Sequence, residues 1–166
     1  DATKANQGTT ELRQMEQSAA AAGTEISTDM ILDWLSREHS ILRNYGHISQ
    51  YVDLFHPAKP GDHEVFPMKI GEKSLSRKHL KLQDEDDYQV KMASFDPETV
   101  KEVVRTHIDV QLSANYRIDD VTIRETVNGQ LLAGVYRRIM APVYYESSNT
   151  QLTLVYARLI QPFLPA

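Results

Sequence analysis

The residue types of this sequence that could carry out chemistry include histidines and carboxylates. The tightest grouping is His56 followed by Asp62, His63 and Glu64. Such side chains bind zinc and other divalent metals. However, the segment HPAKPGD has the prolines and the glycine of a loop, and the helical spacing of an HExxH motif is missing. We therefore interpret this segment as a solvent-exposed loop and predict no metal site.

Two further groupings have similar alternatives. His39 and Glu38, with Asp33 nearby, could act as an acid–base pair, but adjacent residues of a helix do not face each other. The acidic run from Asp84 to Asp87 has the oxygen ligands that calcium prefers. It lacks the alternating spacing and the glycine of an EF-hand loop, so a solvated acidic turn is the simpler interpretation.

Tyrosine and arginine gather toward the C-terminal end of the sequence. Arg137 and Arg138 are neighbours in a predicted strand, so one of them points to the core side. An inward arginine pairs with a carboxylate or marks a concave pocket, and clustered tyrosine and arginine are typical of interfaces. The alternative is ordinary sheet packing with an arginine that reaches out to solvent. The predicted interaction residues are Tyr136, Arg138, Tyr145 and Arg158.

The stretch from Asp120 to Phe163 positions these side chains, and its pattern predicts three consecutive strands. Asn128-Gly129 favours a two-residue type I′ turn, because both positions need a positive φ. That turn sets the register, in which Val127 faces Gln130. The predicted core face comprises Val121, Ile123, Leu132 and Tyr136, whereas Thr122, Arg124 and Thr126 are predicted to be solvated.

The second of these strands is expected to run from Gln130 to about Tyr145, and the third from Gln151 to Ile160. Pro142 interrupts the second strand. Proline cannot donate a hydrogen bond to a neighbouring strand, so we expect it at an edge, at a bulge or at the exit of the strand.

The preceding chain has mainly helical patterns. Apolar residues at helical spacing predict a helix over Ile26–Tyr45, and His47–Phe55 continues the pattern as a second short helix or a bent continuation. Short strands are expected near Val65–Met68 and Tyr88–Ala93. A helix from Asp96 to about Ala114 is predicted from an aspartate N-cap followed by proline.

This order of elements predicts an α+β fold, in which N-terminal helices pack on a curved antiparallel sheet that ends in the three-stranded meander. We expect residues 1–25 to form a linker or docking helix and residues 26–166 to form one domain. The net charge of −5 argues against bulk attraction to nucleic acid. The chain has no cysteine, which excludes disulfides and thiolate sites. No cofactor is predicted.

The C-terminal strands also resemble a known family. The residues concerned are Gly134-Val135-Tyr136, Pro142-Val143, Tyr145-Glu146-Ser147 and a last strand that ends near Arg158. They resemble the periplasmic domains of the DotI type, which belong to inner-membrane assembly subunits of bacterial type IV secretion and conjugation machines. The resemblance implies a cone of helices on a curved antiparallel sheet. It also implies a single N-terminal membrane helix and a non-enzymatic role through protein contacts and oligomerisation.

The sequence thus leads to an expected non-enzymatic assembly subunit in a membrane-associated complex of the secretion type. It would be periplasmic and anchored in the inner membrane by a segment upstream of Asp1. Its partners would be other protein subunits, as a homo-oligomer or within a large complex. One alternative is a periplasmic ligand-binding or sensor domain that uses the concavity of the sheet. Others are an enzyme of the same cone fold, for which His107 is the candidate residue, and a structural subunit of an organellar membrane complex.

Overall fold

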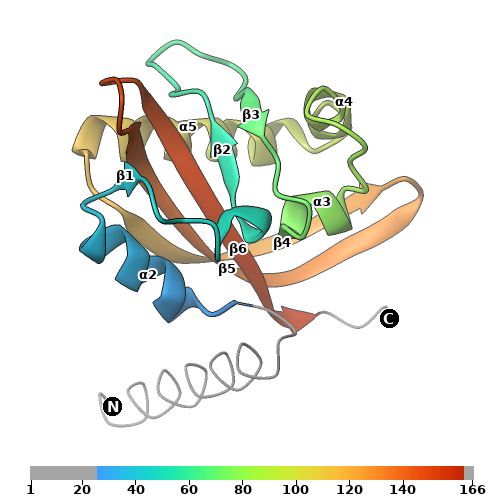
Figure 1. Ribbon diagram of the computed structural model, residues 1–166. Coiled ribbons are helices and arrows are strands. Elements are labelled where there is room, and N and C mark those ends of the chain that lie inside the picture. Colours follow the sequence, from blue (N-terminus) through green and yellow to red (C-terminus); the bar gives the residue numbers. More distant parts are fainter. Residues whose placement is uncertain (1–25, 163–166) are drawn as a thin grey trace, which may run out of the picture. The chain divides into compact units, whose positions relative to one another are not determined.

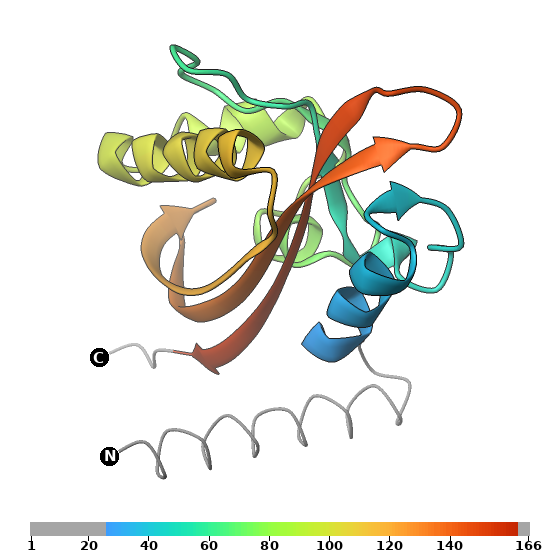
Figure 2. The same ribbon diagram turned by 90° about the vertical axis from the view of Figure 1, so that its left-hand side faces the viewer.

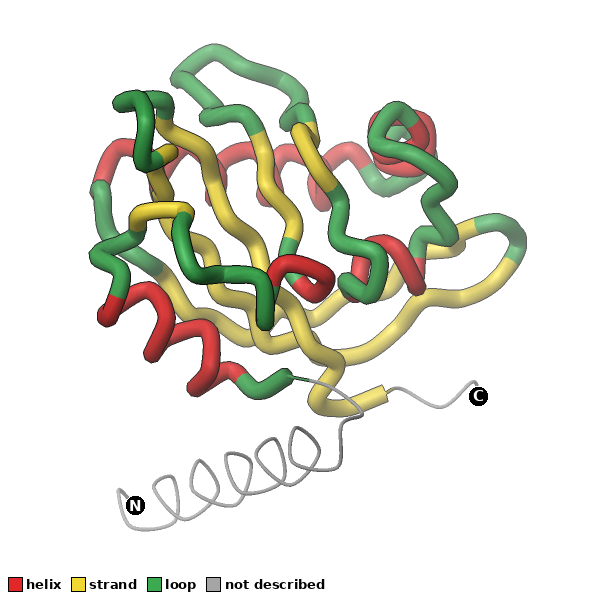
Figure 3. Tube along the Cα trace, viewed as in Figure 1, coloured by secondary structure: helices red, strands yellow, loops and turns green. Residues whose placement is uncertain are grey.

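The computed structural model describes residues 26–162 of the chain. The chain divides into two units, Asp1–Ser40 and Ile41–Ala166. The described residues form four α-helices and a mixed sheet of six strands, which confirms the predicted α+β class (Figures 1 and 3). The expected linker or docking helix lies outside the described residues, so the division at residue 25 stays a prediction.

In the first unit, helix α2 comprises Thr28–Arg37. Its N-cap is Ser27, whose hydroxyl oxygen accepts a hydrogen bond of 3.2 Å from the backbone N–H of Met30. The predicted end at Tyr45 is wrong. His39 and Ser40 have φ angles of 52° and 62°, and a right-handed helix cannot continue through such residues.

The second unit begins with a strand where the sequence pattern predicts helix. Strand β1, Ile41–Leu42, pairs in parallel with Tyr144–Tyr145. The predicted helix over His47–Phe55 is also wrong, since only the single 3₁₀ turn η1, Ser49–Tyr51, lies there. Strand β2, Asp53–Phe55, follows it directly. In both places pairing with a neighbouring strand outweighs a helical spacing of apolar residues.

The predicted meander forms the main part of the sheet. Its strands are β4, Arg117–Val127, β5, Gln130–Tyr145, and β6, Gln151–Pro162. The strand order is β1-β5-β6-β2-β3, where β3 is Pro67–Lys69, and β4 pairs with β5. All pairs are antiparallel except the two-residue pairing of β1 with β5, so the sheet is antiparallel as predicted apart from this one parallel strand.

The β4–β5 hairpin has the predicted register. Asn128 and Gly129 have φ angles of 51° and 76°, as a type I′ turn requires, and Val127 is paired with Gln130. The pairing then continues without a shift along the whole of β4. Side chains therefore alternate between the two faces of the hairpin over its full length.

Pro142 neither ends β5 nor sits at a bulge. It is paired with Thr153 of β6 on one side. On the other side of β5, β4 ends opposite Met140 and β1 begins opposite Tyr144. Pro142 thus lies in the interval between two partner strands, where the missing N–H removes no hydrogen bond of the sheet.

Along the chain, three helices of the second unit follow the short strands and precede the meander. They are α3, Leu75–His79, α4, Asp87–Met92, and α5, Pro97–Ser113. The expected strand near Tyr88–Ala93 is wrong, although Tyr88, Val90 and Met92 alternate as in a strand. Tyr88 and Met92 are buried one helical turn apart, whereas Val90 is 68% exposed.

Helix α5 has the predicted boundaries. The side chain of Asp96 accepts a hydrogen bond of 2.8 Å from the backbone N–H of Glu98, and Pro97 occupies the first helical position. The helix ends where Ala114 adopts a left-handed conformation with a φ of 56°. Strands β4, β5 and β6 are strongly curved, and α5 lies across their concave side (Figure 2).

Apolar residues from the helices, the loops and the sheet form the core beneath α5. The buried members of this cluster are Phe55, Ala58, Val65, Ile70, Leu80, Leu82, Tyr88, Met92, Phe95, Val104 and Val127. Most of them come from the irregular segment between β2 and α5. This segment is therefore part of the folded core, because it supplies the apolar surface that α5 and the sheet enclose.

The close packing of Gly71 against β2 and η1 gives a first prediction. A Cβ atom on Gly71 would lie 2.5 Å from the carbonyl oxygen of Gln50 and 2.6 Å from that of Val52. Both atoms belong to the backbone, so a side chain could not displace them without moving β2. We expect Gly71→Ala to lower the free energy of unfolding by about 1–3 kcal/mol, measured by urea denaturation.

Gly46 provides the matched control. A Cβ atom on Gly46 would have no neighbour within 4 Å, and its φ lies outside the positive range. We expect Gly46→Ala to change stability by less than about 0.5 kcal/mol. Equal effects of the two substitutions would contradict the packing of Gly71 described above.

Candidate ligand cavity

A cavity of about 420 Å³ lies between the concave face of the sheet and helices α3, α4 and α5. This volume is typical of small-molecule sites, which range over about 300–1,000 Å³. Most of its wall is apolar. The lining side chains include Phe55, Leu75, Leu80, Tyr88, Met92, Phe95, Val103, His107, Val121, Ile123, Leu132, Tyr136, Arg138, Met140, Val155 and Ala157.

Three rings stack edge to face in the wall of the cavity. The ring of Phe55 lies 4.9 Å from that of His107 at an interplanar angle of 73°. The ring of Tyr88 lies 5.2 Å from that of Phe55 at an interplanar angle of 70°. Edge-to-face packing places the positive edge of one ring against the negative face of the next. The three side chains come from β2, α5 and α4, so the stack holds these elements around the cavity.

His107 is a neutral polar group in this wall. It is 2% exposed, and its Nδ1 atom is buried with no hydrogen-bond partner among residues 26–162. Burial, together with the smaller effect of the positive charge of Arg138, lowers the pKa of His107 from 6.5 to about 3. The imidazole is therefore uncharged at neutral pH.

Arg138 brings a charge to the cavity, but this charge is compensated. Its Nε and Nη2 atoms donate to the two oxygens of Asp119 at 3.1 Å and 3.0 Å. The two residues are directly opposite each other in the β4–β5 register. Their side chains are only 14% and 23% exposed, so the pair is largely shielded from water.

Tyr136 and His79 form a second polar contact at the cavity. The hydroxyl of Tyr136 lies 3.5 Å from Nδ1 of His79, and the two rings meet edge to face at 5.8 Å and 88°. Burial raises the pKa of the Tyr136 hydroxyl, which therefore stays protonated at neutral pH. The contact links β5 to α3.

Asp53 is a buried carboxyl group on β2, next to the residues that form the cavity. Burial raises its pKa from 3.8 to about 6. Hydrogen bonds from the hydroxyl of Ser74 and the backbone N–H of Gly71, the latter 3.0 Å long, partly offset this increase. Bonding to Ser76 and the charge of Arg77 act in the same direction. Asp53 thus changes its charge near neutral pH.

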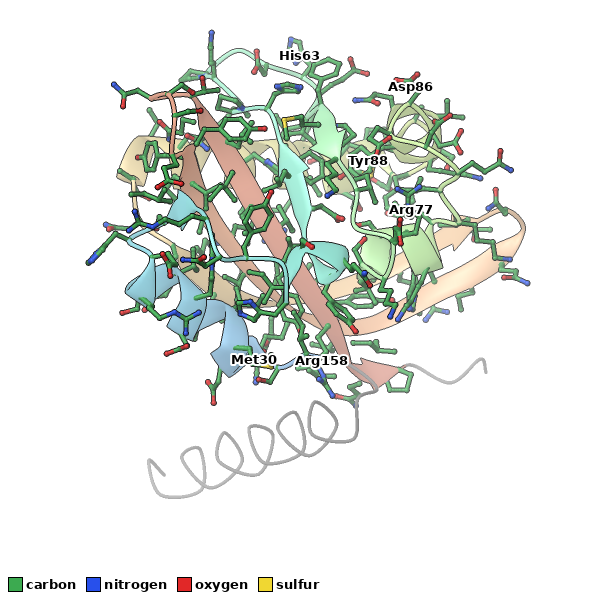
Figure 4. All side chains as sticks on the ribbon, viewed as in Figure 1. Met30, His63, Arg77, Asp86, Tyr88 and Arg158 are labelled. Atoms are coloured by element: carbon green, nitrogen blue, oxygen red, sulfur yellow. The ribbon has the colours of Figure 1, made fainter. Side chains whose placement is uncertain are left out.

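The structure places the four predicted interaction residues in three separate parts of the sheet. Tyr136 and Arg138 both line the cavity. The hydroxyl of Tyr145, at the far end of β5, donates to the Sδ atom of Met68 at 3.1 Å. Arg158 is paired in register with Arg137, on the face of the sheet opposite Arg138, and lies near the lower end of β6 in Figure 4.

The histidine loop and the acidic run considered from the sequence are surface features, whereas Glu38 of the third grouping is buried. His56, Asp62, His63 and Glu64 are all exposed, and His63 lies on the loop between β2 and β3 (Figure 4). In the acidic run, Asp84 accepts a hydrogen bond of 3.1 Å from the backbone N–H at the start of α4. Within the described part of the chain, no three histidine or carboxylate groups are placed to hold a metal ion.

Several residues that line the cavity or bond to its lining were not predicted from the sequence. Asp119 could have been found, because continuing the register of the hairpin places it opposite Arg138. Tyr88 and Phe55 lie in segments with the wrong predicted structure, so their orientation was not foreseeable. His79 lies on a helix that begins at the N-cap Ser74, whose side chain accepts from the N–H of Arg77 at 3.2 Å.

Comparisons with protein-family models, with curated protein sequences and with solved structures found no match. The resemblance to DotI-type domains therefore stays a prediction. Of the helices between residues 26 and 162, none is both long enough and apolar enough to cross a membrane.

The pairing of Arg138 with Asp119 gives a second prediction. Removal of either side chain leaves a poorly hydrated charge, so Arg138→Ala and Asp119→Ala should each lower stability by about 1–3 kcal/mol. The double variant should lose less than the sum of the two, because the second substitution removes the unpaired charge. Urea denaturation of the four proteins gives the coupling free energy.

The neighbouring pair in the same register is the control. Arg137 is bonded to Asp120 at 3.0 Å on the opposite face of the hairpin, and Asp120 is 48% exposed. Its coupling free energy should be no more than about 1 kcal/mol, because water screens it. A coupling at Arg138 as small as that at Arg137 would contradict the shielded pair.

Asp53 and His107 give a third prediction, because their titrations act on stability in opposite directions. Asp53 binds its proton more tightly when folded, so its contribution is present below pH 3.8 and is lost as the pH rises through about 6. His107 binds its proton less tightly when folded. Its contribution is present above pH 6.5 and is lost as the pH falls toward about 3.

Between about pH 4 and pH 6 the two effects offset each other in the parent protein. As the pH rises from 4 to 7, the free energy of unfolding of Asp53→Asn should therefore increase by about 3 kcal/mol relative to that of the parent. His107→Phe should show the opposite trend and lose stability relative to the parent over that range. Urea denaturation at each pH measures both differences, and parallel curves for the parent and both variants would contradict the assignment.

Proposed function

We propose that this protein binds a small, uncharged and mainly apolar molecule in the cavity beneath α5. The observation that supports this proposal is the cavity itself, whose wall is largely apolar and aromatic. Burial of an apolar ligand against such a wall removes apolar surface from water, which is the main source of affinity in sites of this kind.

The charges around the cavity favour an uncharged ligand. Arg138 is compensated by Asp119, and His107 is neutral at neutral pH. The exposed carboxylates Glu98 and Glu102, which also line the cavity, are paired with basic residues of the same helix. An anion would have to compete with Asp119 for Arg138, and a cation would meet the positive charge of Arg138.

The polar groups of the wall suit recognition better than acid–base catalysis. A catalytic base works best when its pKa is close to the working pH. The pKa of His107 is about 3, so its imidazole is a weak base in this environment. His107, Tyr136 and His79 can instead orient a ligand through hydrogen bonds, as a carrier or sensor domain requires.

The assembly role implied by the DotI resemblance stays a second proposal, together with the periplasmic location and the membrane anchor. Its four candidate residues, which include Tyr145 and Arg158, do not form one surface. A different feature supports protein contacts. The side chains of Leu112, Tyr116 and Ile118, around the end of α5 and the start of β4, are 69%, 58% and 42% exposed.

Filling the cavity tests the ligand proposal. Ala157 lines the cavity from β6, so Ala157→Phe should occupy part of it. Nile red, a neutral apolar dye, should bind to the parent protein with an increase in fluorescence. We expect the variant to bind the dye at least about tenfold more weakly, which corresponds to about 1.4 kcal/mol.

Ala133 provides the matched control, because it lies on β5 opposite Arg124 and outside the cavity wall. Ala133→Phe adds the same ring and should leave dye binding unchanged. Val103→Phe fills the cavity from α5 and replaces Ala157→Phe in this test if that variant does not fold. Equal dye binding by the parent and all folded variants would refute a ligand site in this cavity.

A further inference from the structure

Strand β4 has one edge to which no other described strand is paired. It lies at one end of the sheet and pairs only with β5. The ordered hairpin is long, since β4 runs from Arg117 to Val127 without a bulge. An edge of this length presents a row of backbone groups that can pair with another chain.

The turn of the hairpin determines which residues have backbone groups at this edge. In a two-residue hairpin, the residues next to the turn form a hydrogen-bonded pair, here Val127 and Gln130. Hydrogen-bonded and non-hydrogen-bonded pairs alternate along an antiparallel ladder. The odd-numbered residues of β4 are therefore bonded to β5. The even-numbered residues, from Ile118 to Thr126, direct their N–H and C=O groups to the unpaired edge.

The charges of these even-numbered residues are arranged for self-pairing. Asp120 and Arg124 lie at equal distances on either side of Thr122, and all three are exposed. No carboxylate of residues 26–162 forms an ion pair with Arg124. If two copies pair antiparallel about Thr122, each Asp120, which is also bonded to Arg137 of its own chain, lies opposite Arg124 of the second copy. Opposite charges placed in this way stabilise a strand pair, and like charges destabilise it.

Other registers of the same edge lack this complementarity. A register centred on Asp120 or on Arg124 places two like charges opposite each other. A register centred on Val121 or on Ile123 places Asp120 opposite threonine. The register centred on Thr122 also overlaps the greatest length of β4, so charge and length select the same arrangement.

This register has one unfavourable pair, Asp119 opposite Glu125 of the second copy, on the concave face. Both carboxylates already have partners within their own chain. Asp119 is bonded to Arg138. Glu125 accepts a hydrogen bond of 2.6 Å from the hydroxyl of Thr99 and is thereby turned toward α5. The repulsion between them is reduced accordingly.

We propose that two copies of this chain associate edge to edge through β4, in an antiparallel register centred on Thr122. The two sheets would then form one continuous sheet across the two-fold axis. The exposed side chain of Ile118 would lie opposite Thr126 of the second copy and would be partly covered. This association involves the edge of the sheet, whose central residues Val121, Thr122 and Ile123 also line the cavity.

Single cysteines test the register directly, because the chain has no cysteine of its own. In the proposed pairing, the Cα atoms of the two Thr122 residues lie about 5.5 Å apart, within the range of about 4.4–6.8 Å that a disulfide spans. Thr122→Cys should therefore form a disulfide-linked dimer on mild oxidation of the full chain. The two Thr126 positions would be roughly 26 Å apart, so Thr126→Cys should cross-link far more slowly.

Charge reversal tests the interaction in the absence of cross-linking. Arg124→Glu places like charges opposite each other at two positions, so it should weaken the dimer at least tenfold in sedimentation velocity. Arg105→Glu, on the exposed surface of α5, makes the same change in net charge and should leave the dimer intact. Circular dichroism of both variants would check that they are folded.

Three outcomes would overturn the proposal. The first is a parent protein that sediments as a monomer at every concentration tested. The second is cross-linking of Thr126→Cys as fast as that of Thr122→Cys. The third is a dimer that Arg124→Glu weakens no more than Arg105→Glu does.

Discussion

The register of the β4–β5 hairpin is the constraint on which most of the second unit depends. It originates in two residues, Asn128 and Gly129, whose positive φ angles allow a turn that matches the twist of the strands. From that turn the pairing runs unshifted to Arg117 opposite Met140. A slip of one residue would exchange the faces of every side chain in β4. It would move Asp119 away from Arg138 and would replace the apolar wall of the cavity by threonine and arginine.

The length of β5 is the second determinant, because this strand serves different partners along one edge. Its first part pairs with β4 and its last residues pair with β1, with Pro142 in the interval. A proline within a strand is tolerated only where its missing N–H has no partner to satisfy. The change of partner therefore accounts for the position of Pro142.

The sequence predicts those elements whose information is local. The hairpin depends on one dipeptide, and α5 depends on Asp96 and Pro97 at its start, so both could be foreseen in position as well as in type. The segment from Ile41 to Met92 could not. Ile41 and Leu42 fit a helix by spacing, and they become a strand only because Tyr144 and Tyr145 are available as partners.

The same distinction applies to the cavity. Tyr136 and Arg138 could be selected from the sequence, because strand alternation shows which face they share. Tyr145 and Arg158 were grouped with them by residue type, and type alone does not place side chains together. Phe55 and His107 are far apart in the sequence and meet only through the packing of α5 on β2. Such contacts depend on tertiary packing, on which a local pattern carries no information.

The ionisable groups at the cavity show what burial does to the chemistry of the site. Burial disfavours the charged form of both acids and bases, so it raises the pKa of Asp53 and lowers that of His107. Arg138 cannot respond in this way because a guanidinium keeps its proton, and its charge is instead met by a carboxylate from the adjacent strand. Each group thus loses or compensates its charge by the means that its own chemistry permits. The result is a cavity wall with polar atoms but little net charge.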